Sequence, residues 1–346
     1  MTVVAPARPV RDARQILRDT GRETFPVLRA AADRLPAGIR HPVGVHFGWW
    51  DQAGRPLENS AGKAVRPALA LLACEAVGGA RSAALPAAVA VELVHNASLL
   101  HDDIIDGDRL RRGRPALWAL SGVPAAILAG DALFFLAVQA VSEAPPPLDG
   151  AGPGLLTAAV QDLIDGEYTD TLLEGRSAVS VEECVAMAAG KTGALIAVSC
   201  ALGALAGGAD AERVGHLRAF GAHVGAAFQL VDDLLGIWGD PARTGKPAGA
   251  DLAARKKSLP VTAALATDGA AGRELSLLYA DPGPLSPAEL ARAAQLVEAA
   301  GGRFWAAQEA DRHIQQALAQ LTAARPGEVA AAELTALAHL ISSRNH

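Results

Sequence analysis

Apolar residues recur every three or four positions along most of the chain, the spacing that places them on one face of a helix. This pattern predicts helices over Arg66–Val77, Ala84–Ile105, Ala125–Val141 and Glu212–Trp238. No run of alternating apolar and polar residues between turn signals indicates a sheet. Loops rich in Pro and Gly are expected at Glu143–Gly154, Gly239–Gly249 and Asp281–Pro287. The pattern therefore predicts an all-α protein, with a flexible N-terminal tail over 1–13 and a single helical domain over 14–346.

The composition narrows the possible function classes. Of 346 residues, 51% are apolar and 20% are charged, so the chain can bury a large core and is not disordered. Lys and Arg number 31 against 37 Asp and Glu; the net charge of −6 argues against binding nucleic acid. The cysteines lie far apart in apolar surroundings, which is typical of a reducing cytosol. The N-terminus lacks a signal-peptide core. We expect a cytoplasmic protein with no membrane span.

Two pairs of adjacent aspartates, Asp102-Asp103 and Asp232-Asp233, each end an apolar helical run. Asp102 and Asp106 are one helical turn apart and project from the same face. Like charges at that spacing repel, so they are a poor choice for stability alone. Carboxylates suit Mg²⁺, which is commonly shared between one or two carboxylates and substrate phosphates. A solvated helix end is the alternative, but the occurrence of two such pairs favours metal binding.

The basic residues indicate that a phosphate group binds together with the metal. Only five of the 31 are lysines, and they lie in GK, KT or KKS contexts typical of phosphate ligands: Lys63, Lys191, Lys246, Lys256 and Lys257. Codon drift is the alternative explanation for their scarcity. Four arginines follow the first aspartate group within residues 109–114 and are suited to bidentate phosphate binding. No GxxxxGK[ST] occurs, which argues against a P-loop nucleotide triphosphatase.

Together these motifs resemble the trans-isoprenyl diphosphate synthases, the polyprenyl synthetase family that includes bacterial geranylgeranyl and farnesyl diphosphate synthases. The resemblance covers Gly62 to Pro260. The family's DDxxD stands at 102–106 and is followed by Arg-Arg-Gly at 111–113, while GKxxRP stands at 62–67. The KT pair stands at 191–192, FQ at 228–229, and the second aspartate motif begins at 232. The resemblance implies one large helical bundle of the isoprenoid synthase type with a central apolar cavity, acting as a homodimer.

The resemblance also implies roles for individual residues. About three Mg²⁺ ions per active site are implied, held by Asp102, Asp106 and Asp232, with Asp103 and Asp233 in support. The implied ligands of the allylic diphosphate are Arg111, Lys191, Lys246 and Lys256. Those of isopentenyl diphosphate are Lys63, Arg66, His95 and Arg112. Further substrate contacts are implied for Thr192, Phe228, Gln229 and Asp233.

Three positions depart from the family pattern. Gly236 stands where many relatives have a third Asp in the second motif, and Asp240 is a candidate replacement. The usual Gly-Gln of the middle helix reads Gly166-Glu167, which changes one polar contact. The GKxxRP motif lacks the common double Gly. None of these changes removes a primary ligand.

Product length in this family depends on what closes the pocket below the first aspartate motif. Ala97 and Ser98 are one turn before Asp102 and are small, so this helix offers no aromatic floor for a C15 product. Val94 and Leu93 line the next level, which leaves Phe134 and Phe135 as floor candidates, with ordinary core packing as their alternative role. We expect a C20 product, with C15 and C25 left open.

The implied activity is a trans-prenyltransferase that joins isopentenyl diphosphate to dimethylallyl, geranyl or farnesyl diphosphate. A class I terpene cyclase on the same fold is one alternative, and it has no need for the four isopentenyl diphosphate ligands, all of which are present. A non-catalytic subunit of a heteromeric synthase is another, and it is expected to lack the first aspartate motif, which is intact here. Both observations favour chain elongation.

Overall fold

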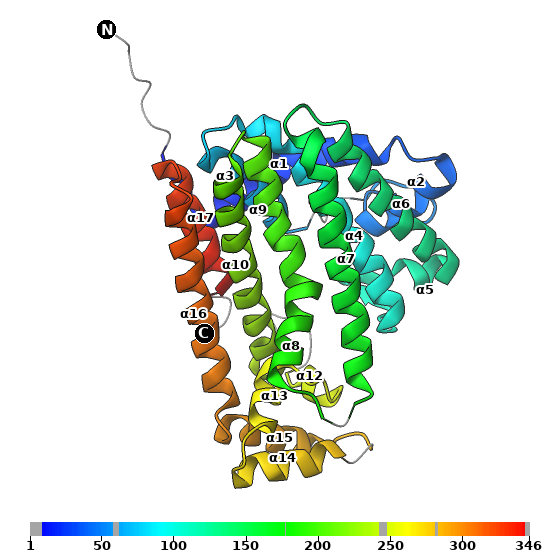
Figure 1. Ribbon diagram of the computed structural model, residues 1–346. Coiled ribbons are helices and arrows are strands. Elements are labelled where there is room, and N and C mark those ends of the chain that lie inside the picture. Colours follow the sequence, from blue (N-terminus) through cyan, green and yellow to red (C-terminus); the bar gives the residue numbers. More distant parts are fainter. Residues whose placement is uncertain (1–8, 58–61, 177, 242–247, 281–282, 343–346) are drawn as a thin grey trace. The chain divides into compact units, whose positions relative to one another are not determined.

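The structure is a computed structural model that describes residues 9–57, 62–176, 178–241, 248–280 and 283–342. Within these ranges the chain is built of helices with one short hairpin (Figure 1). Contacts between residues divide it into two compact units of interleaved segments. Unit 1 comprises Met1–Val160, Val198–Arg218 and Thr322–Leu334, and unit 2 comprises Gln161–Ala197, Ala219–Leu321 and Thr335–His346. The sequence predicted a single helical domain, and these contacts group its residues into two compact units.

Unit 1 contains the N-terminal helices and the hairpin. Its elements are α1 (Ala13–Ala32), α2 (Ala37–Phe47), α3 (Val65–Ala76), η1 (Arg81–Ala84), α4 (Leu85–Ile105), β1 (Leu110–Arg111), β2 (Arg114–Pro115), α5 (Leu117–Ser121) and α6 (Val123–Ser142). Helices with residues in both units are α7 (Leu148–Glu174), α9 (Ala194–Ala206), α10 (Ala211–Trp238), α16 (Gly302–Ala323) and α17 (Glu328–Ser342).

The core of unit 1 forms around α4, which is apolar on nearly all sides and buried from Ala87 to Val94. Helix α6 packs closely on α4 at Gly130, where a Cβ would lie only 2.3 Å from His101 Nε2. Helices α3 and α9 approach in the same way: a Cβ at Gly203 would lie 2.0 Å from the Ala70 carbonyl oxygen. Such contacts fix α4, and with it the aspartates at its carboxyl end.

The N-terminal segment is ordered closer to the start than the sequence suggested. Helix α1 begins at Ala13, with the Asp12 side chain accepting a hydrogen bond from Gln15 N. The Arg11 guanidinium binds the fully buried Glu333 carboxylate through Nε at 3.0 Å and Nη2 at 2.8 Å. The flexible tail predicted over 1–13 therefore does not include residues 11–13, because a buried carboxylate needs a cationic partner.

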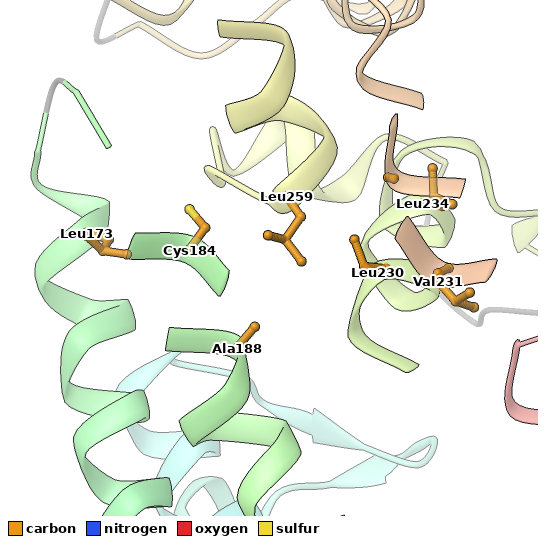
Figure 2. Close-up of a cluster of buried hydrophobic side chains, with 9 residues drawn as sticks. Leu173, Cys184, Ala188, Leu230, Val231, Leu234 and Leu259 are labelled. Atoms are coloured by element: carbon orange, nitrogen blue, oxygen red, sulfur yellow. The ribbon is translucent and has the colours of Figure 1, made fainter. Parts of the chain in front are cut away.

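Unit 2 contains the second group of helices: α8 (Val181–Ala188), η2 (Ala189–Gly193), α12 (Ala250–Ala253), α13 (Leu259–Leu265), α14 (Ala270–Ala280) and α15 (Pro287–Ala299). Serine side chains cap the starts of α8 and α15 in capping boxes. Figure 2 shows one of its apolar clusters, with Leu259 of α13 beside side chains of α7, α8 and α10. Burial of each leucine contributes about 1.5–3 kcal/mol before chain entropy is counted.

The observed helices agree with the apolar spacing, since α3, α4, α6 and α10 each lie within two residues of the predicted bounds. The loop predicted at Glu143–Gly154 is wrong in its second half, because α7 starts at Leu148 and includes Pro153. Pro153 is the sixth residue of α7, and its missing N–H removes a single helical hydrogen bond, so the Pro/Gly composition did not stop the helix. The hairpin β1–β2 was not predicted.

Three segments of the described chain are long and apolar enough to cross a membrane by length and composition alone: Arg81–Ile105, Val123–Ser142 and Val181–Ala206. The first and third contain Glu92 and Lys191, which lie among oppositely charged side chains within their own units. In the second segment only 39% of the most apolar stretch is buried, so α6 keeps an exposed apolar face.

Candidate active site

The carboxyl end of α4 in unit 1 carries the first aspartate motif. The Asp106 amide donates to the Asp102 carbonyl oxygen at 2.8 Å, so the two residues are one turn apart as predicted. Carboxylates at this end of a helix face the negative end of its dipole, which favours a nearby cation. Asp103 differs from the other two because it is buried, and its Oδ1 accepts a hydrogen bond from Arg111 Nε at 2.7 Å. Its Oδ2 is buried with no hydrogen-bond partner among the described residues.

The hairpin β1–β2 places the arginines that follow this motif. Arg112 and Gly113 at its turn both have positive φ, 53° and 73°, as a two-residue hairpin turn requires. Beyond the turn, the Arg114 guanidinium donates to the His46 carbonyl oxygen at 3.0 Å. A side chain at Gly48 would collide with this guanidinium at 2.2 Å, so Gly48 is needed for the contact. The hairpin is thus attached to α4 through Arg111 and to the end of α2 through Arg114.

A buried polar layer lies around the predicted isopentenyl diphosphate ligands. Glu92 is 5% exposed; burial raises its pKa, and the charges of Arg66 and Arg112 partly offset that rise. Asn96 Nδ2 donates to Glu92 Oε1 at 3.2 Å, and Asn96 Oδ1 faces His46 Nε2 at 3.2 Å. Because Asn96 Oδ1 only accepts, His46 carries its proton on Nε2. The layer therefore connects α2 to the two arginines through α4.

Two histidines of this layer are neutral. Burial lowers the pKa of His46 to about 3, with a further contribution from Arg112. Burial also lowers the pKa of His95 well below its usual value, again with the charges of Arg66 and Arg112. His95 therefore offers a substrate a hydrogen bond rather than a positive charge. The cationic character of this part of unit 1 comes from its arginines and Lys63.

A cavity of about 340 Å³ borders the layer in unit 1. Gly62 and Glu92 form part of its wall, and its apolar wall consists of Phe25, Pro26, Leu28, Phe47, Trp49 and Leu57. Arg29 lines it too, with its guanidinium 5.0 Å from the Trp49 ring centroid. Its lining thus combines one cation, one buried carboxylate and apolar or aromatic side chains, a mixture typical of small-molecule sites.

Four of the residues predicted to set product length lie on α4, and the other two, Phe134 and Phe135, lie on α6. Leu93, Val94 and Ala97 are fully buried, and Ser98 is 8% exposed. On α6, the Phe134 ring lies 5.8 Å from the His101 ring centroid. Phe135, however, is 77% exposed, so it does not line an interior pocket of this chain. The next residue along a helix is rotated by about 100°, which separates it from Phe134.

In unit 2, Lys191 lies on the π-helical turn η2, a feature common at functional sites. Its Nζ is 2.6 Å from Asp170 Oδ2 and 2.9 Å from Glu167 Oε2. Burial lowers the pKa of Lys191, but these two carboxylates outweigh burial and raise it. The contact depends on Gly166, because a Cβ there would lie 2.2 Å from the Lys191 backbone nitrogen.

A chain of hydrogen bonds continues from Thr192. Its hydroxyl donates to Gln229 Oε1 at 2.7 Å, and Gln229 Nε2 donates to Asp233 Oδ1 at 2.7 Å. Asp233 Oδ2 then accepts from the Leu259 amide at 2.8 Å, at the start of α13. Burial raises the pKa of Asp233 to about 6. Asp233 was predicted to contact substrate; instead it is 4% exposed and its oxygens hold α10 to α13.

The exposed carboxylate of the second motif is Asp232, at the end of α10. One turn later, Gly236 has no side chain, and a Cβ there would lie 2.0 Å from Asp251 Oδ2. Asp251 thus occupies the space of a third acidic side chain, whereas the sequence suggested Asp240. Lys256 is half-buried; burial lowers its pKa, but Asp233 and other carboxylates outweigh burial and raise it.

Two other lysines complete the set. Lys257 Nζ donates to the carbonyl oxygens of Leu173 and Glu174 at 3.0 and 3.1 Å, and so caps the carboxyl end of α7. Its role is structural. Lys246 lies outside the described residues, so its predicted role is not placed. Phe228 is half-buried on α10 next to Gln229.

Comparisons with known proteins identify the family. The family model for polyprenyl synthetase matches residues 48–297. The chain belongs to the polyprenyl synthetase family. It is 48% identical over 322 residues to a protein of Mycobacterium bovis named (2E,6E)-farnesyl diphosphate synthase, covering 92% of this chain and 90% of that one. A geranylgeranyl diphosphate synthase of Mycobacterium tuberculosis is 44% identical over 320 residues, with the same coverage. The crystal structure of a polyprenyl synthetase from Streptomyces coelicolor A3(2) matches with a TM-score of 0.92 and 47% identity, over 95% of this chain and 99% of that one.

Membership of this family confirms the all-α fold and makes the protein a prenyl-transferring enzyme. The family generally uses Mg²⁺, and the donors in each unit fit a hard cation. Asp102 and Asp106 carry carboxylates one turn apart, and Asp103 Oδ2 is a buried oxygen without a hydrogen-bond partner among the described residues. No cluster of three His, Cys, Asp or Glu suited to a metal occurs in the described chain. This donor set suits ions that share their ligands with substrate phosphates.

Sequence reasoning missed several polar residues of the site: His46, Glu92, Asn96, Asp170 and Asp251. Glu92 and Asn96 carried one usable signal, since they are polar residues one turn apart within an otherwise apolar helix. His46, Asp170 and Asp251 had no comparable signal, because their roles depend on contacts with other elements.

Proposed function

We propose that the protein condenses isopentenyl diphosphate with an allylic diphosphate to give a linear all-trans prenyl diphosphate. The observation that supports this best is the layer around Glu92, where Arg66 and Arg112 offset the charge of a buried carboxylate beside a cavity. These arginines provide a place for a second diphosphate in unit 1. Elongation needs that second diphosphate, whereas cyclisation of a single long diphosphate does not.

In this proposal the carboxylates of each motif are ligands for Mg²⁺. Asp102 and Asp106 of unit 1, and Asp232 of unit 2, would hold the ions, which would supply positive charge that stabilises a leaving diphosphate. Arg111 binds the same group, and its ion pair with Asp103 keeps the guanidinium oriented. Lys191 and Lys256, both in unit 2, are further proposed ligands of an allylic diphosphate. His95 donates a hydrogen bond to isopentenyl diphosphate and helps to orient it for attack.

We further propose that the main product has 20 carbons. Two small residues, Ala97 and Ser98, lie one turn before Asp102. A bulky aromatic ring at this position would end elongation at a shorter product. The names of the two relatives described above divide between C15 and C20. Replacing Ser98 with Phe should shorten the main product to C15, while Ser98→Ala should leave it unchanged.

Product analysis by mass spectrometry tests the activity. The enzyme receives Mg²⁺ and isopentenyl diphosphate with dimethylallyl, geranyl or farnesyl diphosphate in turn. We expect linear diphosphates that grow by C5 steps, with C20 the longest abundant one. Cyclic hydrocarbon formed from a long diphosphate alone would identify a cyclase, and no turnover with any primer would indicate a non-catalytic subunit.

A soluble, cytoplasmic homodimer is the proposed working form. Helix α6 exposes Ile127, Leu128 and Phe135, of which Phe135 is the most exposed at 77%. Ile127 and Leu128 are adjacent, and Phe135 lies seven and eight residues further along, so the three share one face of the helix. Such an exposed apolar stripe is typical of a subunit interface. The proposed partner is a second copy of this chain. Phe135→Glu should convert the dimer to a monomer in analytical ultracentrifugation, and Phe304→Glu, on exposed α16, should not.

A further inference from the structure

The Arg29 guanidinium is a cation with no acidic partner among the described residues. Arg29 lies in the last turn of α1 and lines the cavity of unit 1. Its guanidinium carbon lies 5.0 Å from the Trp49 ring centroid and 4.8 Å from that of Trp50. Within the described chain the guanidinium makes neither an ion pair nor a hydrogen bond. Its positive charge is therefore held by aromatic rings, whose π faces attract cations.

The two indole rings are themselves held in place. Trp49 stacks on Phe47, with ring centroids 4.6 Å apart and an interplanar angle of 8°. Trp50 packs directly against the backbone of α2, since a Cβ at Gly44 would lie 2.0 Å from its ring carbon Cζ2. Both rings follow the end of α2, at Phe47. The rings therefore orient Arg29 before any ligand binds.

This mode of attachment leaves Arg29 able to bind an anion. A guanidinium that stacks on a ring contacts it through its flat face, so its in-plane N–H groups remain available as donors. A basic residue in the last turn also lies near the negative end of the helix dipole, but that attraction does not direct the side chain toward a cavity. Arg111, by contrast, is already paired with the Asp103 carboxylate. An anion that binds Arg29 displaces no carboxylate of the described chain.

The position of Arg29 indicates which anion it binds. The cavity that it lines has a volume of about 340 Å³ and is also lined by Gly62 and Glu92. A Cβ at Gly62 would lie 3.3 Å from Arg112 Nη2, so the Arg112 guanidinium reaches this part of the wall. Lys63 directly follows Gly62 in the chain. Lys63 and Arg112 are both predicted ligands of isopentenyl diphosphate, so Arg29 borders the same cavity as the segments that carry them.

We propose that Arg29 is a further ligand of the phosphate groups of isopentenyl diphosphate, supplied by α1. This inference rests on the proposed function, in which isopentenyl diphosphate is the second substrate. Arg29 contributes a charge that no described carboxylate compensates and a planar set of N–H donors suited to phosphate oxygens. It acts on isopentenyl diphosphate rather than on the allylic diphosphate, because the proposed ligands of the latter do not line this cavity within the described chain.

The test replaces Arg29 with Gln, which removes the charge and keeps a polar side chain. We expect the KM for isopentenyl diphosphate to rise about tenfold, as for the loss of one charge-assisted hydrogen bond. The KM for geranyl diphosphate should stay within about twofold. Isothermal titration calorimetry with isopentenyl diphosphate alone, on the full-length enzyme, should show the same loss of affinity. Arg29→Lys, which keeps the charge but lacks the planar fork, should recover part of it.

Arg18→Gln is the matched control. Arg18 is exposed on nearly the same face of α1 as Arg29, about three turns or 16 Å earlier along the helix. The substitution removes the same charge away from the cavity, so both KM values should stay within about twofold of the wild type. Both variants should keep the wild-type melting temperature, because both arginines are exposed.

The outcomes separate this inference from the proposed function. If the wild-type enzyme elongates and folded Arg29→Gln keeps its KM and affinity for isopentenyl diphosphate, the inference is overturned. An equal rise in both KM values, or an equal rise with Arg18→Gln, also overturns it, because the effect would then be general electrostatic attraction. A lowered melting temperature with no recovery in Arg29→Lys would assign the effect to the structure and overturn it too. Failure of the wild-type enzyme to elongate any primer refutes the proposed function instead, and is seen before any variant is made.

Discussion

A carboxylate added at Gly236 is expected to conflict with Asp251. A Cβ at Gly236 lies 2.0 Å from Asp251 Oδ2, so an aspartate there brings two carboxylates within about 4 Å of each other. Two like charges at 4 Å repel by about 4 kcal/mol at an effective dielectric constant of about 20. Both positions are half-buried, and side-chain rotation together with solvent screening lowers the expected cost to about 1–2 kcal/mol.

The assay is thermal unfolding of Gly236→Asp against Gly236→Asn, which has nearly the same size without the charge. In EDTA the aspartate variant should melt lower by several degrees, at about 2–4 °C for each kcal/mol. In an Asp251→Asn background the difference between the two variants should vanish, as a double-mutant cycle requires. Millimolar Mg²⁺ should narrow the difference, because a divalent cation binds both carboxylates.

Equal melting temperatures for Gly236→Asp and Gly236→Asn in EDTA would show that the two carboxylates do not meet. A difference that survives in the Asp251→Asn background would assign the conflict to another group. In either case Asp251 would not occupy the space of the missing third acid.

Three further predictions concern unit 1. Asp102→Ala should lower turnover by at least about 100-fold. Its melting temperature should stay the same or rise slightly, because the substitution removes a carboxylate from the negative end of a helix. Wild-type turnover would refute the metal assignment. Arg11→Ala should lower the free energy of unfolding by about 3–5 kcal/mol, measured in denaturant, because Glu333 is fully buried; a loss below 1 kcal/mol would contradict this. His46 binds protons less readily when folded, with a pKa of about 3 against 6.5, so stability falls as pH drops from 6.5 toward 3, by about 2 kcal/mol at pH 5. His46→Gln should flatten this fall in melting temperature, and an unchanged profile would show that another group causes it.

The positions of helices were predictable from the sequence where they depend only on the apolar spacing within one helix. The runs that became α4 and α10 show their apolar spacing directly in the sequence, and their ends lie within a residue of the prediction. The start of α7 was missed because Pro153 was interpreted as a breaker, whereas its cost depends on how near it lies to the first turn. The division into two units depends on contacts between distant segments, which apolar spacing does not report.

The candidate site was predictable in its residue types more than in their surroundings. Asp233 and Asp232 are adjacent and identical in type, yet one is buried against α13 and the other is exposed. The sequence context of Lys257 is typical of a phosphate ligand, but its capping of α7 could be seen only in the structure. In each case the role of the side chain depends on which neighbouring element packs against it. The sequence of a single helix does not contain that information.

In both units, a basic residue assigned to diphosphate is already paired with a carboxylate of the same unit. Arg111 pairs with Asp103, and Lys191 pairs with Glu167 and Asp170. In the proposed function, substrate binding at these residues would therefore be an exchange or sharing of anions rather than the filling of a bare positive site. Because the charge is compensated beforehand, the cations stay oriented without substrate, at the cost of weaker ground-state binding. These cations would then stabilise the negative charge that develops as the diphosphate departs more than they stabilise the bound substrate. Such a difference favours the transition state.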